Sequence, residues 1–585
     1  MSRFLSCSLV FVCVCVSTFT TTQASEKPNV VVILTDDQGW GDLSVNGNTN
    51  LSTPNIDSLA ADGATMNNFY VCSVCAPTRA EFLTGRYHLR TGVSGVSRGE
   101  GRLNADETTI ADLFHQADYA TGAFGKWHNG TQPPLHPNYR GFDEYYGFTS
   151  GHWGHYFSPP LDHNGQKVRG KGFIVDDFTN HAIDFIKTNR DKPFFCYLPL
   201  NTPHSPMMVE DRFYEKFAGK ELSMKHREPQ REDIMMTRAA LAMCENIDWN
   251  VGRVLKTIDD LLLRDNTIVV FFCDNGPNSY RFNGAMKGKK GTVDEGGLRS
   301  PFFIRWPGKV QQGRRVETIC AAIDLLPTLT DLAEIESATA HAIDGKSFKP
   351  LLTQDNPSWE SRTLFSSWKN KATARTQQFR IDNTGALYDI QADRGQTTDV
   401  SEKHPQKANH LRKLLKNYRD EMETLRRNHA NRPFAVGYAK STTLPARDAI
   451  EHGTIKRSAK PPNNSFFTNW TSTDDSITWE IEVLKAGVYE TTVYYTCAQG
   501  DQGSTVIAGI DGGESVQAAV AKVFDPPLYD KSKERVSESH YFVKDFIPIK
   551  IGNLKLDAGT HTLRLKAADI KGDQVIDVHS IELVR

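Results

Sequence analysis

The chain has 585 residues, of which 39% are hydrophobic, so it is long enough for a large domain and a smaller one rather than one ordinary core. Its 68 Lys and Arg residues nearly balance 70 Asp and Glu residues. This balance excludes a strong overall field that would attract nucleic acid or an acidic membrane surface, and we expect neither as a partner. Any selectivity for anions must therefore be local.

The first residues have the pattern of a cleaved secretory signal. Arg3 is followed by an apolar stretch, 4–16, and then by small polar residues up to position 24. The apolar stretch is shorter than the roughly 20 residues that a membrane-spanning helix needs. Cys13 and Cys15 each follow Val, which does not resemble the Gly or Ala before the cysteine of a bacterial lipobox. We therefore expect residues 1–24 to be removed and the protein to be secreted or periplasmic.

Near-continuous apolar runs separated by helical patterns predict a parallel sheet with helices on both faces. The runs are 30–34, 119–124, 194–200, 268–273 and 302–306. Thr53 and Pro54 mark the start of one helix, and Gly63 is placed to end it. Apolar residues at helical spacing predict a second, longer helix at 236–263.

The sequence changes character near residue 430. A charged helical segment is followed by an irregular one rich in Pro, Arg, Lys and Thr, and then by alternating strands with glycine-containing turns. The alternating part predicts an all-β sandwich. We therefore expect a catalytic domain at 25–435, a linker at 436–462 and a β-sandwich domain at 463–585.

Polar residues follow four of the predicted strands at the point where each strand ends. In chain order, they are Asp36 and Asp37, then Lys126 and His128, then His204, then Asp274 and Asn275. Because ligands bind outside the carboxyl ends of the strands in an open parallel sheet, we expect these side chains to form one site.

The four oxygen-bearing residues of this set predict a metal site. Neighbouring carboxylates repel one another unless a cation or a proton lies between them. Asp36, Asp37, Asp274 and Asn275 offer only oxygen donors, which favour calcium or magnesium over zinc. Either pair alone could be a helix cap or a turn. The two pairs together, both at strand ends, favour the metal site.

One cysteine stands out by its place in the sequence. Seven of the ten cysteines lie beyond the predicted signal, and this odd number leaves one without a disulfide partner. Cys75 precedes a helix that Pro77 can begin and Gly85 can end. A helix N-terminus has unpaired amides and a partial positive charge, which suit an anionic nucleophile or a bound sulfate or phosphate. A buried cysteine beside a helix start is the alternative.

Cys75-x-Pro77-x-Arg79, followed by Leu83-Thr84-Gly85-Arg86, resembles the signature of the formylglycine-dependent sulfatases, which belong to the alkaline phosphatase superfamily. The similarity extends to Asp36-Asp37-Gln38, Gly125-Lys126-Trp127-His128, Asp274-Asn275-Gly276, Lys290-Gly291-Thr292 and Leu387-Tyr388-Asp389. Thr78 stands where many relatives have Ser. The resemblance implies an α/β fold with a mixed, mostly parallel sheet between helices, here with an appended β-sandwich, and hydrolysis of sulfate esters.

The resemblance also implies how the nucleophile is made and held. The formylglycine-generating enzyme would convert Cys75 to formylglycine, whose hydrate would attack sulfur with one hydroxyl and expel sulfate after deprotonation of the other. The residues that would hold Ca²⁺ are Asp36, Asp37, Asp274, Asn275 and the modified Cys75.

Six residues would then be catalytic. Besides Cys75, Arg79 would polarise the formylglycine, Lys126 would contact the nucleophile and the sulfate, and His128 would act as the base. His204 and Lys290 would face the leaving oxygen, and His204 as a cation would donate the proton that a sugar alkoxide needs.

The substrate is predicted less directly. His152, Trp153 and His155 could stack on a sugar ring and bind its hydroxyls, or they could belong to a packed surface loop. The C-terminal domain is similar to carbohydrate-binding β-sandwiches of secreted bacterial enzymes, although it could instead be structural. A sulfated carbohydrate is the predicted substrate, and removal of the residues after about 445 is predicted to spare cleavage of a small aryl sulfate.

The sequence leaves two alternatives open. One is a phosphate or phosphonate monoester hydrolase of the same superfamily. The other is a glycan-binding protein in which Cys75 stays unmodified.

Overall fold

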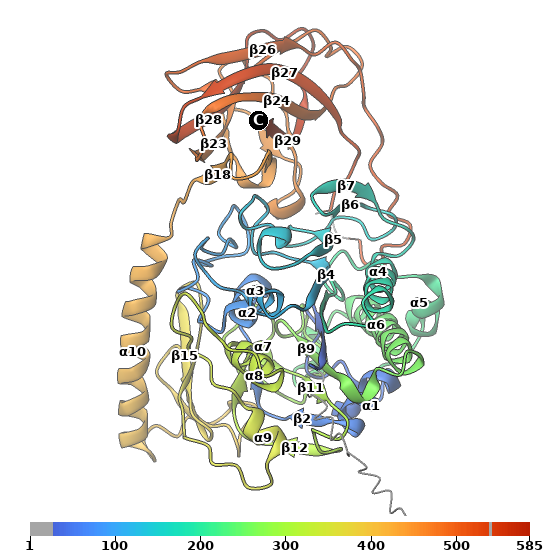
Figure 1. Cartoon of the computed structure of the whole chain (residues 1–585), viewed down its shortest axis with the longest axis vertical. Coiled ribbons are helices and arrows are strands. Elements are labelled where there is room, and N and C mark those ends of the chain that lie inside the picture. The colour runs from blue at the N-terminus through green and yellow to red at the C-terminus, as the bar shows by residue number, and fades with distance from the viewer. Residues whose placement is uncertain (1–26, 538–540) are drawn as a thin grey trace, which may run out of the picture.

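The computed structural model describes residues 27–537 and 541–585, so the predicted signal at 1–24 lies outside the described residues. Figure 1 shows a large α/β unit with a smaller unit of β-strands at one end of the long axis. Helix α10 (Pro405–Asn428) runs along the side of the α/β unit toward β18 (Phe434–Val436), the first strand of the C-terminal unit. In the described part of the chain, none of the helices combines the length and the apolar composition that crossing a membrane requires.

A ten-stranded mixed sheet forms the centre of the α/β unit. In spatial order its strands are β12 (Arg314–Val316), β2 (Ala64–Met66), β11 (Phe302–Arg305), β9 (Thr267–Cys273), β1 (Asn29–Thr35), β8 (Phe194–Pro199), β4 (Ala120–Lys126), β5 (Glu144–Phe148), β6 (Pro160–His163) and β7 (Gln166–Arg169). The four central strands, β9, β1, β8 and β4, are parallel, whereas β11 is antiparallel to β9. The predicted mixed, mostly parallel sheet is confirmed.

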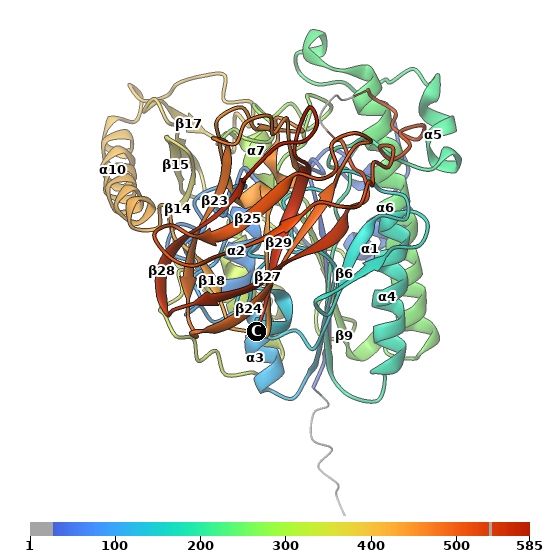
Figure 2. The same cartoon turned by 90° about the horizontal axis from the view of Figure 1, so that it is seen from above.

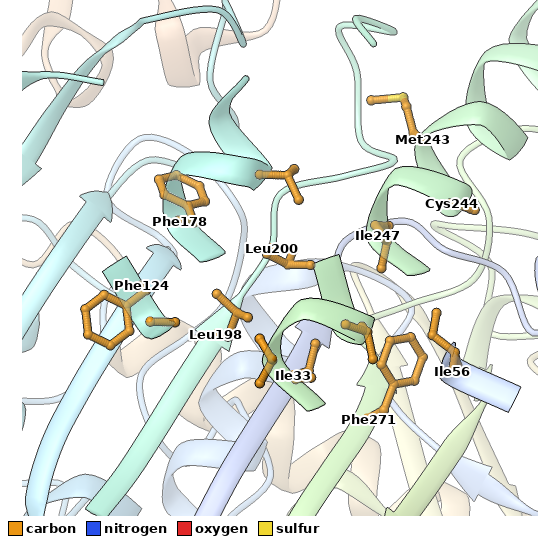
Figure 3. Packing of buried hydrophobic residues seen from close by; sticks show 14 of the residues in the cluster. Ile33, Ile56, Phe124, Phe178, Leu198, Leu200, Met243, Cys244, Ile247 and Phe271 are labelled. Carbon is orange, nitrogen blue, oxygen red and sulfur yellow. The ribbon is translucent and has the colours of Figure 1, made fainter. Parts of the chain in front are cut away.

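Helices cover both faces of this sheet, which explains why its central strands are apolar throughout. Val31 and Ile33 of β1 belong to one core cluster, whereas Val30 and Val32 belong to another on the opposite face. Figure 3 shows the first cluster, where Phe178 and Ile247 lie on the helix side of the strands that carry Leu198 and Ile33. Its helices are α1 (Pro54–Asp62), α4 (Ile174–Thr188) and α6 (Ile234–Asp260), and those of the second are α2 (Cys75–Thr84), α3 (Ile110–Gln116) and α8 (Leu325–Leu332).

Smaller elements complete the α/β unit. A three-stranded sheet contains β10 (Arg299–Ser300), β3 (Phe69–Tyr70) and β13 (Cys320–Ala321). A four-stranded sheet contains β14 (Leu364–Trp368), β15 (Lys371–Arg375), β16 (Phe379–Ile381) and β17 (Leu387–Asp389), and α10 packs on it. The short helices are α5 (Asp211–Ala218), α7 (Glu295–Leu298) and α9 (Lys349–Thr353).

The C-terminal unit is the predicted β-sandwich, with one apolar core between two sheets. The first sheet contains β18, β23 (Ser476–Val483), β28 (Gly559–Ala567), β25 (Thr505–Ile510) and β26 (Ser515–Ala519), with β20 (Ile450–His452) on β23. The second contains β21 (Lys456–Arg457), β22 (Phe467–Thr468), β29 (Asp577–Val584), β24 (Gly487–Thr496) and β27 (Ile547–Leu556), with β19 (Ser441–Pro445) on β29.

The structure differs from the expectation of a linker at 436–462. This segment supplies β19, β20 and β21 to the two sheets, and its Leu444 and Ile455 are buried in the sandwich core. Strands this short need only a few backbone hydrogen bonds, and they lack the long alternation of apolar residues by which a strand is predicted. The C-terminal unit therefore begins at β18, and the predicted linker is part of it.

Candidate active site

The ends of the parallel strands bring the predicted residues together. Asp36 and Asp37 directly follow β1, Lys126 ends β4, and Asp274 directly follows β9. All four side chains are buried. His204 lies a few residues beyond β8 and its Nε2 is 3.7 Å from Asp37 Oδ2. The parallel arrangement of β9, β1, β8 and β4 thus produces the expected single site.

Helix α2 begins at Cys75 and directs its N-terminus at this site. Thr78 Oγ1 accepts a hydrogen bond from the backbone N–H of Cys72 and donates one to the carbonyl oxygen of Asp274, at 2.9 Å and 2.6 Å. Arg79 donates to Asp274 Oδ2 at 2.8 Å and to the carbonyl oxygen of Lys126, also at 2.8 Å. These bonds hold the helix start, and Cys75 with it, against the ends of β9 and β4.

The carboxylates are only partly satisfied by the side chains around them. Lys126 Nζ lies 2.6 Å from Asp36 Oδ2, and Lys290 Nζ lies 2.6 Å from Asp37 Oδ1. Asp36 Oδ1 and Asn275 Oδ1 are buried and have no hydrogen-bond partner among the described residues. Ligand atoms of Asp36, Cys75 and Asp274 lie within 4.8 Å of one another. A hard cation requires buried oxygen ligands of this kind, so the residues present fit a calcium ion.

The proton affinities of these carboxyl groups differ. Burial, together with repulsion from Asp36, raises the pKa of Asp274 to about 7, although Arg79 opposes the rise. Burial alone would raise the pKa of Asp37, but Lys290 and then His204 hold it below its ordinary value. Asp274 therefore carries the excess repulsion of the cluster, which a bound cation would relieve.

One ring nitrogen of His128 has a backbone partner and the other has none in the described part of the chain. Its Nε2 is 2.9 Å from the carbonyl oxygen of Val96, so this nitrogen carries the hydrogen of the neutral ring and Nδ1 keeps a lone pair. Nδ1 is buried without a hydrogen-bond partner among the described residues. Burial and then Lys126 hold the pKa of His128 well below its ordinary value. The ring is neutral at neutral pH and can accept a proton at Nδ1.

His204 and Lys290 lie at the solvent side of the site. Their side chains are 13% and 22% exposed, whereas those of Asp36 and Asp37 are at most 1% exposed. Burial and then Lys290 lower the pKa of His204, and its Nδ1 lies 2.7 Å from the carbonyl oxygen of Ser205. The expected cationic His204 is thus not favoured in the free site. Burial would also lower the pKa of Lys290, but Asp37 raises it above its ordinary value.

Of the three residues predicted to contact the substrate, the structure brings only His152 to the site. Its ring is stacked 5.9 Å from that of His204, and its Nε2 is buried without a hydrogen-bond partner among the described residues. Trp153 stacks on Phe148 at 5.1 Å and packs against the core. His155 is turned toward the C-terminal unit, with Nε2 2.8 Å from the carbonyl oxygen of Asp530.

Two supporting residues were missed by the sequence analysis. Arg281 is buried and donates to Asp42 at 2.7 Å and to the carbonyl oxygen of Asp37 at 2.9 Å. It thus supports Asp37, whose backbone is left-handed with φ 67°. Its loop carries no recognisable motif, so only the structure could identify it. Thr78 was noted as a departure from the signature, but its hydrogen bonds with the backbones of Cys72 and Asp274 could not be foreseen.

This fold and site define a hydrolase of the alkaline phosphatase type, with a candidate cation site beside a helix N-terminus. The family model of the sulfatases matches residues 28–335, and the model described as N-sulphoglucosamine sulphohydrolase, C-terminal, matches residues 289–427. The chain therefore belongs to the sulfatase family and is an enzyme, a sulfatase.

Similar proteins include sulfatases of animals and bacteria. The chain is 31% identical to the N-acetylgalactosamine-6-sulfatase of Mus musculus, over 56% of this chain and 67% of that protein. It is 28% identical to the N-acetylgalactosamine-6-O-sulfatase of Bacteroides thetaiotaomicron, over 67% of this chain and 93% of that protein. Among solved structures, the crystal structure of Ps i-CgsB matches this chain with 30% sequence identity and a TM-score of 0.60. The match covers 67% of this chain and 93% of that one.

Proposed function

We propose that this sulfatase removes sulfate groups from a sulfated carbohydrate, with a formylglycine made from Cys75 and with calcium. The observation that carries the proposal is the position of Cys75 at the N-terminus of α2, among three buried aspartates and five basic side chains. The substrate class is supported by the two N-acetylgalactosamine sulfatases and by the Ps i-CgsB structure in complex with k-i-k-neocarrahexaose. A secretory signal at 1–24 would place the enzyme where such polymers occur, outside the cell or in the periplasm.

Asp36, Asp37, Asp274 and Asn275, with the modified Cys75, would hold the calcium ion. When bound, the ion would stabilise negative charge on the sulfate oxygens. The unpaired oxygens of Asp36 and Asn275 support this ligand set.

Conversion of Cys75 would replace a poor nucleophile. The thiol is buried, and burial raises its pKa above the ordinary value, although Lys126 opposes the rise. An unmodified thiol would therefore remain protonated and unreactive at neutral pH. The formylglycine hydrate supplies one hydroxyl for attack on sulfur and a second whose deprotonation releases sulfate.

The basic residues would divide the remaining work. His128 Nδ1 would accept the proton of the second hydroxyl, because it is buried without a hydrogen-bond partner among the described residues. Arg79 would hold the modified residue in orientation through its bonds to Asp274 and to the end of β4. Lys126, paired with Asp36, would contact the nucleophile and the sulfate.

His204 and Lys290 would act at the leaving oxygen, on the side of the site open to solvent. A bound sulfate ester would bring negative charge to His204, which favours its protonated form. The proton could then pass from Nε2 to the leaving alkoxide, while Lys290 stabilises the charge there. Proton donation by His204 thus depends on the bound anion. His152, stacked beside His204, would contact the sugar.

Sulfate release from a panel of defined sulfated oligosaccharides tests the substrate class. We expect the protein with converted Cys75 to desulfate at least one oligosaccharide and to cleave 4-nitrophenyl sulfate much faster than 4-nitrophenyl phosphate. Faster cleavage of the phosphate would favour a phosphate or phosphonate monoesterase. Binding of the oligosaccharides without release of sulfate, together with an intact Cys75 thiol, would favour a glycan-binding protein.

A further inference from the structure

The loop that follows β4 and carries His128, here called the His128 loop (127–135), is contacted by the C-terminal unit. Arg447 donates to Thr131 Oγ1 at 2.7 Å, and Gln132 donates to the carbonyl oxygen of Thr443 at 3.1 Å. Both contacting residues of the C-terminal unit belong to the segment expected to be a linker. The first part of the C-terminal unit therefore packs directly against the active site.

A third contact reaches His128 itself through one shared carbonyl group. Asn463 lies in a 3₁₀ turn, Pro462–Asn464, and its side-chain Nδ2 donates to the carbonyl oxygen of Val96 at 2.8 Å. The same oxygen lies 2.9 Å from His128 Nε2. The backbone oxygen of Asn463 accepts a hydrogen bond from Ser150 Oγ at 2.5 Å, which fixes the turn on the α/β unit.

Asn463 and His128 both pack closely against Gly151. A Cβ atom added to Gly151 would lie 2.2 Å from Asn463 Nδ2 and 2.5 Å from His128 Nε2. The two side chains are thus pressed against the same glycine backbone. Asn463 is only 9% exposed. A displacement of Asn463 would free the Val96 carbonyl and, with it, the ring of His128.

We propose that Asn463 is a positioning residue for His128, and that the C-terminal unit thereby completes the active site. The inference rests on the proposed role of His128 as the base. Its physical basis is that the Val96 carbonyl fixes both the tautomer and the orientation of the ring, so that Nδ1 keeps its lone pair in one fixed position. Loss of this orientation slows the proton transfer but leaves the sulfate-binding cations in place.

Asn463→Asp tests the proposal with an isosteric change. The variant replaces the amide donor by a carboxylate oxygen, which repels the Val96 carbonyl. Asn469→Asp is the matched control, because Asn469 Nδ2 also donates to a backbone carbonyl, that of Thr454, but within the C-terminal unit alone. We expect Asn463→Asp to lower kcat on 4-nitrophenyl sulfate about tenfold or more, with KM and formylglycine content unchanged. The control should keep the wild-type kcat.

Hydrogen–deuterium exchange provides a readout that does not depend on turnover. We expect faster exchange at 93–101 and 127–132 in Asn463→Asp, and no change there in Asn469→Asp. A wild-type kcat in Asn463→Asp, an equal loss of kcat in both variants, or unchanged exchange at these segments would each overturn the proposal. If the wild-type protein releases no sulfate, the proposed function fails, whereas the exchange result still decides whether Asn463 holds the His128 loop.

Discussion

At the scale of single residues, the site is a buried group of charges in which the carboxylates are not all paired equally with basic side chains. Asp36 and Asp37 each have a lysine partner, whereas Asp274 is left with Arg79 and with repulsion from Asp36. The raised pKa of Asp274 reports this imbalance. A divalent cation would complete the charge balance and lower the proton affinity of the carboxyl group.

Calcium is therefore expected to stabilise the fold. Addition of calcium to the protein freed of metal by a chelator should raise its Tm, and at about 100 times Kd the gain in the free energy of unfolding is about 2.7 kcal/mol. Asp274→Asn should abolish this shift. Asp248→Asn is the matched control, because Asp248 is also buried but lies outside the site, bonded to Asn55 and to the backbone N–H of Ile56. Equal Tm values with calcium and with chelator would contradict the assigned metal site.

Glu81 of helix α2 predicts a pH dependence of stability. Burial raises its pKa to about 8, against 4.5 for an ordinary Glu. Between these values the unfolded chain releases the proton and the folded chain keeps it, so stability falls as the pH rises, by up to about 1.4 kcal/mol per pH unit. The Glu81→Gln variant has no carboxyl group at this position and therefore lacks this loss of stability with rising pH. The Tm of the variant relative to wild type should therefore increase between about pH 5 and pH 8.

The exposed Glu221 offers a control for this measurement. Glu221→Gln should follow the wild-type Tm at each pH, because the side chain lies at the surface. A parallel pH course of Glu81→Gln and wild type would show that Glu81 is ionised in the folded protein.

At the scale of the elements, the sequence predicted the central strands, because burial on both faces of a strand requires apolar residues throughout. The central strands β1, β8 and β9 read as continuous apolar runs because helices cover both sides. Residues at their carboxyl ends could be assigned to one site for the same reason. Strands of two or three residues, such as β10 and β21, have no such signature and emerged only from the structure.

The sequence was less informative about loops, because its residue types did not reveal which unit a loop would face. Trp153 and His155 were predicted to contact the substrate together with His152, yet Trp153 packs against the core and His155 bonds to the C-terminal unit. Contacts between segments hundreds of residues apart, such as Asn463 with Val96, have no local signal at all.

The end of β9 depends on a close approach of two backbones. A Cβ atom on Gly276 would lie 2.0 Å from the carbonyl oxygen of Gly296, so Gly276→Ala must displace the neighbouring Asp274 and Asn275. We expect this variant to lose most of its sulfatase activity, measured on 4-nitrophenyl sulfate. Gly219→Ala is the control, since nothing lies within 4 Å of its added Cβ. Wild-type activity in Gly276→Ala would show that the strand end tolerates displacement.

At the scale of the whole molecule, the C-terminal unit packs against the α/β unit at more than one place. Figure 2 shows its sheets lying over the α/β unit, with an extension that reaches α5. In this extension, Met208 and Glu534 form an antiparallel bridge, and Arg535 donates to the carbonyl oxygen of Val209 at 2.6 Å and to Asp211 at 2.5 Å. Such contacts are not those of a module on a flexible linker.

Deletion of the residues after 445 should therefore impair more than polymer binding. The cut would open the core around Leu444 and remove Asn463 from the His128 loop. We expect the truncated protein to lose activity on 4-nitrophenyl sulfate as well as on a sulfated polysaccharide, with circular dichroism to confirm that the α/β unit stays folded. Retained cleavage of the small ester would instead support the independent module that the sequence suggested.

Cys75, converted to formylglycine, is the nucleophile that we propose for this sulfatase. The most direct measurement combines mass spectrometry of the peptide that contains residue 75 with sulfate release by the same preparation. We predict that sulfate release rises in proportion to the formylglycine content and is abolished in a folded Cys75→Ala variant. Sulfate release by a preparation whose Cys75 is an intact thiol, or by Cys75→Ala, would contradict the claim.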